Sequence, residues 1–362
     1  MRETSICVIG GGSRQWAITL FKDLSLNKMT HGKLVLHDID HQAAVNNIDV
    51  ANRIFAKNGA EGNFIVSAEK DLHKALVGAD IVVISIEPGS TLLRYNDLVL
   101  PEQYGILQTV GDTTGPGGII RARRAVPLFL NFGKAIGEVC PNAWVINYTN
   151  PMTLCTAALY RGFPKIKALG CCHEVFKFGH FFAKIVAKEF NVPEPDRREI
   201  ALDITGVNHF TWITKASWNG IDLMPFAVAK AKDPNTYKDY TSVAKERIAN
   251  EKWFDSDHII ALSLLRDMGA LGAAGDRHLA EFVPWYLPSE EHLHTFGVVR
   301  TPYQWRVRKA KEKRNKVFTE EDLVAVPTDE EGVDIIRALM GDRTLLTNIN
   351  VKNEGQISYL PK

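Results

Sequence analysis

Residues 145–175 read VINYTNPMTLCTAALYRGFPKIKALGCCHEV and contain two short apolar runs separated by a helical stretch. The first predicted strand, 144–146, leads into Asn147-Tyr148-Thr149-Asn150-Pro151, and the second, 166–169, leads into Cys171-Cys172-His173. In an open α/β sheet the loops that follow neighbouring strands line one crevice, where ligands bind. Amides, a thiol and an imidazole at two adjacent strand ends therefore indicate a binding site rather than packing alone.

The composition is typical of a globular protein, with 45% hydrophobic and 23% charged residues among 362. A chain of this length usually forms more than one core, so we expect two lobes. The formal net charge of +1 provides no general attraction to nucleic acid or to anionic membranes. No apolar run is long enough to span a bilayer, and the N-terminus leads directly into a strand over 5–9, so we expect a cytoplasmic protein.

The chain has five cysteines, an odd number, and two of them, Cys171 and Cys172, are adjacent. An adjacent pair does not easily close an ordinary disulfide. In a reducing compartment these residues are thiols, and a thiol with a special role is then a metal ligand or a nucleophile.

A glycine-rich turn follows the first strand in residues 5–16, SICVIGGGSRQW. Gly10 and Gly12 match the first two glycines of a dinucleotide-binding turn, and Ser13 lies beside them, but Gln15 stands where a third glycine is expected. The alternative is a tight turn in an α/β protein that binds no nucleotide.

Acidic residues follow the second predicted strand, 33–37, as Asp38 and Asp40. A carboxylate at this strand end accepts hydrogen bonds from the adenosine ribose and disfavours a 2′-phosphate, which favours NAD over NADP. The competing interpretation is that Asp38 or Asp40 caps the helix that follows.

Strands are also predicted at 63–67 and 80–86, and the second of these ends at Glu87. Repetition of strand, helix and strand favours a doubly wound parallel Rossmann-type α/β sheet with right-handed crossovers. Glu87 and Asn147 would line its cofactor site. We therefore predict an NAD-binding domain over 1–170 and an α+β metal- and substrate-binding lobe over 171–362.

Three further segments carry polar or charged patterns. Residues 105–124 are rich in glycine, which indicates either close approach of the backbone to a ligand or a surface lid. Residues 203–212 read DITGVNHFTW, which predicts an apolar strand with Asn208 and His209 inside it. The basic run 306–316 lacks interleaved aromatic residues, so it is read as a solvated helix face rather than a nucleic-acid-binding patch.

A candidate site can be assembled from Cys172, His173, Asn150, His209 and Asp276. A thiolate and a neutral imidazole suit a borderline divalent metal that keeps open positions for substrate oxygens. The alternative is that the cysteine is an inert buried residue and the histidine satisfies a local hydrogen bond.

Six motifs occur in an order that resembles the NAD- and manganese-dependent glycoside hydrolase family 4, namely VIGGGS, GDTTGPGGIIRARRAVP, VINYTNPM, GCCHEV, GVNHFTW and AAGDRHLAEF. GCCHEVF, NHFTWITKAS and AAGDRHLAEF look most like the α-galacturonidase branch. The resemblance implies that NAD⁺ takes a hydride from sugar C3 to give a ketone, and that Mn²⁺ stabilises the enolate formed when a base removes the C2 proton. The glycosidic oxygen would then leave by elimination, water would add, and NADH would return the hydride.

The resemblance also implies residue roles. Cys172 and His209 would hold the metal, and Asn150 would bind a sugar hydroxyl. His173 would protonate the leaving oxygen and Asp276 would remove the C2 proton, with His278 as its rival. Arg94 and Arg300 would bind a uronate carboxylate, because a guanidinium binds carboxylates through two parallel hydrogen bonds, and the alternatives are Arg121 and Arg124.

The family's proteins are longer than this sequence, so we expect a further helical segment of the second lobe beyond Lys362. A homodimer or homotetramer is implied by the same resemblance. Three alternatives remain: an NAD-dependent hydroxy-acid dehydrogenase of the malate or lactate type, a non-catalytic NAD sensor, or a family member that acts on α-glucosides, α-galactosides or α-glucuronides.

Overall fold

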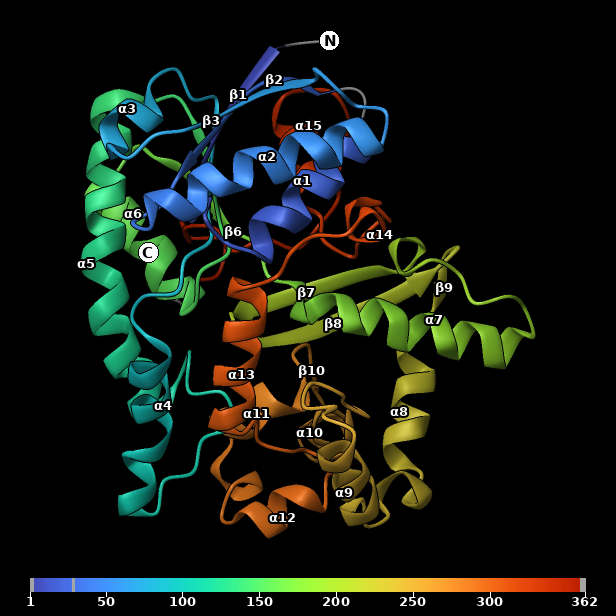
Figure 1. The fold of residues 1–362 in the computed structure, drawn as a ribbon. Coiled ribbons are helices and arrows are strands. Elements are labelled where there is room, and N and C mark those ends of the chain that lie inside the picture. The colour runs from blue at the N-terminus through green and yellow to red at the C-terminus, as the bar shows by residue number, and fades with distance from the viewer. Residues whose placement is uncertain (1–2, 28–29, 359–362) are drawn as a thin grey trace. The chain divides into compact units, whose positions relative to one another are not determined.

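The computed structural model describes residues 3–27 and 30–358, and their contacts divide into two compact units (Figure 1). The first unit consists of Met1–Gly89, Ala122–Cys171 and Val307–Lys362, and the second of Ser90–Arg121 and Cys172–Arg306. The predicted boundary is a single one, at 170/171, whereas the two units interleave along the chain. The division of cofactor and substrate binding between two domains stays a prediction.

The first unit is built on a six-stranded parallel sheet with the strand order β3-β2-β1-β4-β5-β6. This order confirms the predicted doubly wound, Rossmann-type sheet, in which the strand order reverses beside β1 and ligands bind at the carboxyl ends of the strands. The strands are β1 (Glu3–Ile9), β2 (His31–His37), β3 (Phe64–Ala68), β4 (Ile81–Ile84), β5 (Trp144–Asn147) and β6 (Lys167–Gly170).

Helices cover both faces of this sheet, because successive strand residues point to opposite sides. Ile6 and Val8 of β1 belong to one apolar core, and Cys7 and Ile9 belong to the other. Both faces of the strand are therefore buried, as its unbroken apolar run predicts. The first core includes α1 (Trp16–Leu26), α2 (His41–Lys57), α14 (Glu320–Leu323) and α15 (Gly332–Leu339), and the second includes α3 (Leu72–Leu76), α5 (Gly115–Val139) and α6 (Met152–Gly162).

The second unit contains an antiparallel sheet with the order β10-β8-β7, and β9 pairs with β8. Its largest apolar core is formed around α7, with Phe178 and Phe182 fully buried. The elements are α4 (Thr91–Val99), α7 (Phe176–Phe190), β7 (Ala201–Val207), β8 (Phe210–Trp218), β9 (Ile221–Asp222), α8 (Met224–Lys232), α9 (Thr241–Ala249), α10 (Ile259–Met268), β10 (Leu271–Gly272), α11 (Asp276–Phe282) and α12 (Glu290–His294).

The prediction of one strand over 203–212 is wrong, because the chain reverses inside it. Asn208 and His209 form the two-residue connection of a hairpin between β7 and β8, in which Val207 pairs with Phe210. Gly206 has a φ of +130°, and a Cβ atom there would lie 2.6 Å from the Phe210 carbonyl oxygen. Only glycine fits this close crossing, so the polar pair lies at a turn rather than within a strand.

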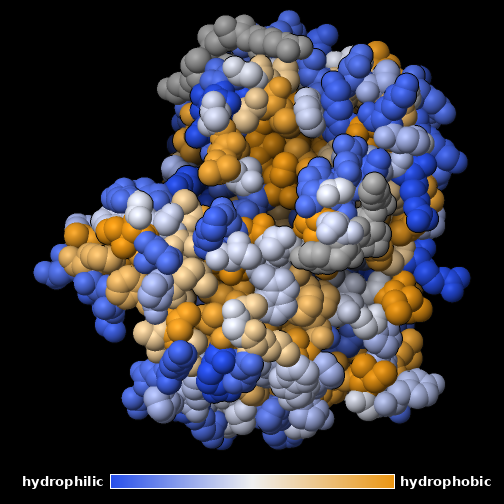
Figure 2. Space-filling view, turned by 180° about the vertical axis from the view of Figure 1, so that it is seen from behind, coloured by the Kyte–Doolittle hydropathy of each residue, from blue (hydrophilic) through white to orange (hydrophobic). Residues whose placement is uncertain are grey.

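The basic run forms part of α13 (Tyr303–Arg314), which has no buried residue along its length, as expected for a solvated helix face. Across the described ranges, no helix is both long and apolar enough to cross a membrane. Apolar side chains reach the surface in separate patches among hydrophilic ones on the face drawn in Figure 2.

Candidate functional site: a dinucleotide-type turn and a buried histidine pair

The glycine turn after β1 packs closely against the backbone of Ser85 and His37 in the first unit. Gly10 has a φ of +99°, and a Cβ atom there would lie 2.0 Å from the Ser85 carbonyl oxygen. The amides of Gly10 and Gly11 both donate to the His37 carbonyl oxygen, at 2.9 and 3.0 Å. Side chains are thus excluded from the turn, as required where a backbone approaches a pyrophosphate.

The two aspartates that follow β2 have different contacts. Asp40 caps α2, because its carboxylate accepts the Ala43 amide at 3.1 Å. Asp38 instead accepts the Gly12 amide at 2.9 Å, which places its carboxylate against the glycine turn. The helix-cap interpretation therefore applies to Asp40, and Asp38 is the carboxylate positioned beside the predicted cofactor site.

The other predicted cofactor residues belong to the same unit but differ in exposure. Ser13 accepts the Trp16 amide at 3.0 Å and so helps α1 to begin. Asn147 is fully buried and shapes its own loop, since its side-chain Oδ1 accepts the Thr149 amide at 2.8 Å. Glu87 is exposed in the segment after β4. Asn150 lies in this unit too, before Pro151, and its predicted role in substrate binding stays a prediction.

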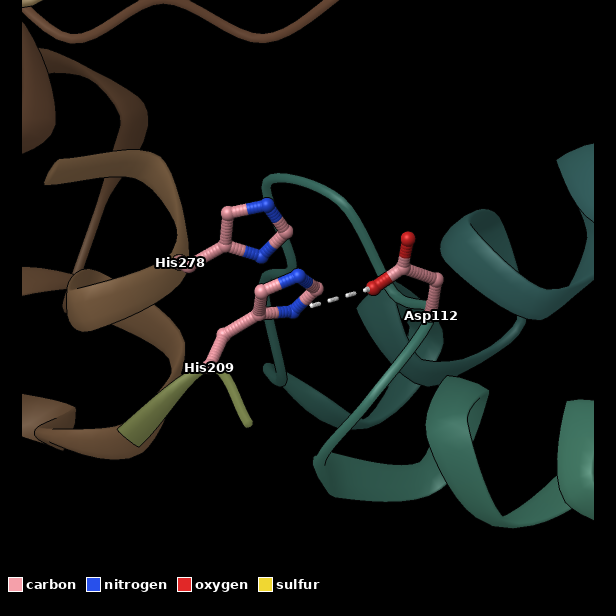
Figure 3. Close-up of side chains that lie close together, drawn as sticks. All are labelled: Asp112, His209 and His278. Carbon is pink, nitrogen blue, oxygen red and sulfur yellow. Dashed lines mark ion pairs between the residues drawn. The ribbon is translucent and has the colours of Figure 1, made fainter. Parts of the chain in front are cut away.

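A cluster of titratable groups, which we call the histidine cluster, is buried in the second unit and consists of Asp112, His209 and His278. Asp112 comes from the loop before α5, His209 from the β7–β8 hairpin and His278 from α11 (Figure 3). One ligand atom from each residue lies within 4.8 Å of the others. The two imidazole rings are stacked, with centroids 3.8 Å apart and an angle of 27° between their planes. Because ring-nitrogen lone pairs lie in the ring plane, stacked rings do not direct their lone pairs at one ion.

Asp112 faces the Nδ1 edge of His209 through a hydroxyl group. Its carboxylate oxygen lies 4.0 Å from His209 Nδ1. Thr113 Oγ1 lies 2.9 Å from the same nitrogen and donates to Asp112 at 2.8 Å. Burial alone would raise the pKa of Asp112, but the charges of His278, His209 and two nearby arginines hold it well below its usual range.

The thiol of Cys172 is the second donor beside His209. Cys172 is buried, at 8% exposure. Burial alone would lower the pKa of His209, but the charge of the Cys172 sulfur and its hydrogen bond, with smaller contributions from nearby carboxylates, raise it to about 9. A thiol and a carboxylate thus each lie beside the same buried imidazole, and a sulfur and a nitrogen donor of this kind suit a borderline divalent cation. The Nδ1 atom of His278 has no hydrogen-bond partner among the described residues.

His173 differs from its neighbour because its side chain remains 44% exposed. Its Nε2 atom lies 3.7 Å from a carboxylate oxygen of Glu174. Glu174 in turn bonds Lys177 at 2.9 Å and accepts the Gly275 amide at 3.1 Å. The GCCHEV motif therefore supplies a buried thiol, an accessible imidazole and a carboxylate that ties both to the start of α11.

Helix α11 holds the loop that carries Asp112. Glu281 accepts the amides of Val110 and Gly111, at 2.6 and 2.8 Å. Arg277 donates to the Thr109 carbonyl oxygen at 3.0 Å, and the Thr109 hydroxyl donates back to the Arg277 carbonyl oxygen. Burial raises the pKa of Glu281 to about 7, although the two amide bonds favour its charged form. These contacts form what we call the α11 clasp.

Asp276, the predicted C2 base, contacts another element. Its side chain is fully buried and accepts the Ala261 amide, in the first turn of α10, at 3.1 Å. Burial raises its pKa to about 6, against the lowering effect of the hydrogen bonds it accepts. Asp276 therefore satisfies a helix start, whereas its rival His278 lies in the histidine cluster.

The predicted carboxylate-binding arginines also differ. Arg300 already bonds Glu102, lies 3.6 Å from Glu290 and donates to the Gln108 carbonyl oxygen at 3.1 Å. Arg94 and Arg121 both lower the pKa of Asp112 by their charge, so both act on the histidine cluster. Arg124 donates to the Pro88 carbonyl oxygen within the first unit.

Sequence reasoning assigned no role to Asp112, Thr113 or Glu281, although all three lie in quoted motifs. GDTTGPGG was interpreted through its glycines, and AAGDRHLAEF through its aspartate and histidine. The available signal was the presence of acidic and hydroxyl side chains inside a glycine-rich loop. Their partners lie 96 and 171 residues away along the chain, so the pattern alone does not identify them.

Comparison with known proteins matches the chain to two family models. The model described as family 4 glycosyl hydrolase matches residues 5–188. The model described as the C-terminal domain of family 4 glycosyl hydrolases matches residues 204–362.

Individual relatives agree with these matches. An alpha-galacturonidase from Bacillus subtilis (strain 168) is 41% identical over 99% of this chain and 79% of its own length. The crystal structure of a Bacillus subtilis protein named as a glucosidase has a TM-score of 0.88 at 42% identity, covering 100% of this chain and 82% of that one. A 6-phospho-alpha-glucosidase from gut microorganisms, solved with NAD and Mn²⁺, shares the fold, with a TM-score of 0.71 at 21% identity over 99% of this chain and 80% of that one.

The raised pKa of Glu281 predicts a pH-dependent contribution to stability. The carboxyl group binds its proton more tightly in the folded chain, so its stabilising contribution is present below about pH 4.5 and is lost as the pH rises through about 7. We expect the unfolding free energy of Glu281→Gln, relative to the unsubstituted protein, to increase by on the order of 3 kcal/mol across that range. Urea denaturation at several pH values measures this difference.

The control is Glu246→Gln, an exposed glutamate on α9. Its unfolding free energy should follow that of the unsubstituted protein at every pH. Parallel curves for Glu281→Gln as well would contradict the assigned pKa shift.

Proposed function

Because the chain belongs to family 4 of the glycosyl hydrolases, we propose that it is an α-galacturonidase that uses NAD and a divalent metal ion. The observation that carries this proposal is the buried group of Cys172, His209 and Asp112 in a chain that also has a dinucleotide-type turn. Support for the sugar comes from the alpha-galacturonidase relative described above.

The residues present fit both NAD and a divalent metal ion. The turn at Gly10–Gly12 leaves no room for side chains, and Asp38 stands beside it to accept ribose hydroxyls. Cys172 and His209 offer a sulfur and a nitrogen donor, and the related phospho-glucosidase was solved with NAD and Mn²⁺. When bound, NAD supplies a reversible hydride acceptor for sugar C3, and the metal supplies a Lewis acid for the C2 and C3 oxygens.

The leaving oxygen needs a proton, and His173 is our candidate donor. It is the exposed member of the GCCHEV motif, and its Nε2 atom lies 3.7 Å from a carboxylate oxygen of Glu174. Asn150 would orient a sugar hydroxyl through its amide. Both roles follow the family resemblance, and the side chains present supply the required chemistry.

The C2 proton needs a base, for which His278 and Asp276 compete. His278 lies in the cluster, and burial and the neighbouring His209 lower its pKa to about 3, so it is neutral with a lone pair available. Asp276 is the stronger base but already accepts a helix amide. A general base must first lie within hydrogen-bond distance of the proton that it removes, and its basicity is considered second. We therefore propose His278, the residue of the histidine cluster, as the base.

We propose that Arg94 and Arg121 recognise the uronate carboxylate, in place of Arg300. Both lie close enough to Asp112 to lower its pKa by their charge, and Arg121 is only 4% exposed. A carboxylate bound beside them would gain charge-assisted hydrogen bonds in a place where water is scarce. Arg300 is committed to two carboxylates of its own unit.

Oligomeric state and location remain predictions. The homodimer or homotetramer is implied by the family alone, and the proposed cytoplasmic location is supported by five cysteines that form no disulfide. A hydroxy-acid dehydrogenase is the second candidate, because the parallel sheet and the turn alone would serve it equally.

Cleavage of an α-galacturonide in D₂O tests the proposed function. We expect hydrolysis only when Mn²⁺ and NAD⁺ are both added under reducing conditions, with one deuterium at C2 of the product by mass spectrometry, because elimination exchanges that proton with solvent. Cleavage without NAD⁺, or without deuterium, would contradict the mechanism. Net NADH production from a hydroxy acid, without cleavage, would identify the dehydrogenase instead.

Two substitutions distinguish the candidate bases. His278→Gln should abolish exchange of the C2 proton with D₂O while NADH still forms transiently, because oxidation at C3 does not need that base. Asp276→Asn should keep the exchange and lower the unfolding free energy by about 1–3 kcal/mol, because a buried hydrogen-bonded carboxylate is altered. Loss of exchange in Asp276→Asn at unchanged stability would return the base role to Asp276.

Arg94→Gln tests the recognition of the carboxylate. We expect kcat/KM for an α-galacturonide to fall about 10- to 100-fold, the equivalent of one charge-assisted hydrogen bond, while any activity on the neutral α-galactoside is unchanged. Arg123→Gln, an exposed arginine of α5, is the matched control. An equal loss on both substrates would show that Arg94 supports the fold of the site instead.

A further inference from the structure

The hydroxyl group of Thr113 lies within hydrogen-bond distance of two polar groups. It lies 2.8 Å from a carboxylate oxygen of Asp112 and 2.9 Å from Nδ1 of His209. A hydroxyl carries one proton but accepts through two lone pairs. It can therefore donate to only one of the two neighbours.

The proton must go to Asp112, because an ionised carboxylate only accepts hydrogen bonds. Asp112 is 5% exposed, and its carboxylate oxygen lies within hydrogen-bond distance of the Thr113 hydroxyl, which donates to it. Toward His209 the Thr113 oxygen is then an acceptor, so Nδ1 must carry the hydrogen. With its hydrogen held on Nδ1, the imidazole can offer only Nε2 to a metal ion, and metal binding displaces any proton from that nitrogen.

We propose that Thr113, backed by Asp112, is a positioning residue that holds His209 in the Nδ1–H form and so reserves Nε2 for the metal. This rests on the proposed function, in which His209 and Cys172 bind that metal. It also assigns Asp112 the role of orienting carboxylate rather than ligand. Partners of this kind fix the ring orientation and increase the basicity of a metal-binding histidine.

The geometry is set in advance by the α11 clasp. Glu281 holds the amides of Val110 and Gly111, directly before Asp112, while the stacked His278 ring packs against the face of the His209 ring. Backbone contacts thus position the loop that carries Thr113, and ring packing positions the imidazole of His209. An imidazole flip would need Thr113 to lose its bond to Nδ1 and would leave a buried nitrogen unpaired.

The test compares Mn²⁺ binding in the protein without substrate, from the electron paramagnetic resonance signal of free Mn²⁺. Thr113→Val keeps the shape but removes the hydroxyl, and should weaken binding about 10- to 100-fold. Thr113→Ser restores the hydroxyl and should stay within about threefold of the unsubstituted protein. Thr114→Val, in the same loop, is the control and should bind normally.

A second readout reports the tautomer itself. In ¹⁵N-histidine-labelled protein with diamagnetic Zn²⁺, His209, assigned with His209→Gln, should show a protonated Nδ1 and a metal-bound Nε2. Thr113→Val should lose this pattern and Thr113→Ser should keep it. Normal Mn²⁺ affinity together with an unchanged tautomer in Thr113→Val would overturn the inference.

Cys172→Ser separates this inference from the proposed function. If Cys172→Ser weakens Mn²⁺ binding and Thr113→Val does not, the metal site stands and the positioning role fails. If Cys172→Ser binds Mn²⁺ normally, the metal site itself is wrong, and the positioning role fails with it.

Discussion

The α11 clasp is the interaction on which the candidate site depends. A glycine-rich loop has little intrinsic preference for one conformation, so its shape must be imposed by partners. Glu281 and Arg277 impose it through backbone amides and carbonyl groups rather than side chains. The same helix carries His278, so one short element both shapes the Asp112 loop and packs against His209.

Buried charge is the cost of this arrangement. An isolated carboxylate in a dry interior is strongly disfavoured, and Asp112, Glu174 and Glu281 are all withdrawn from water to some degree. Each is stabilised by specific donors: Thr113 for Asp112, Lys177 and Gly275 for Glu174, and two loop amides for Glu281. Removing one donor leaves a charge without compensation, so the site is expected to be more sensitive to single substitutions than the surface around it.

Most of the fold follows from local patterns in the sequence. The six strands of the parallel sheet correspond to the apolar runs, within one to two residues at most ends, because a strand buried on both faces must be almost continuously apolar. The hairpin at Asn208–His209 was missed because its tight crossing depends on Gly206, and that glycine resembles a residue within a strand. The interleaving of the two units was also not visible, since composition does not change at residues 90, 122 or 307.

The site was only partly predictable for a different reason. Cys172 and His209 could be proposed from the sequence because thiols and imidazoles are rare and chemically distinctive. Asp112 and Thr113 could not be identified in this way, because aspartate and threonine are common in loops. Their role becomes visible only from the residues that they contact in the folded chain. The distinction between Asp276 and His278 is similar: two residues apart on one short helix, they point to different neighbours, one to the α10 amides and one to His209.

That divergence on α11 explains how one motif serves both structure and chemistry. Successive helix residues point about 100° apart, so Asp276, Arg277 and His278 face three directions. One reaches the start of α10, one the Thr109 backbone, and one the histidine cluster, while Glu281, one turn further on from Arg277, returns to the loop. The structural contacts and the contact with the histidine cluster are thus made from the same helix. A displacement of α11 would therefore alter the Asp112 loop and the packing on His209 together. Reactive groups held this way keep their geometry without any flexible segment of their own.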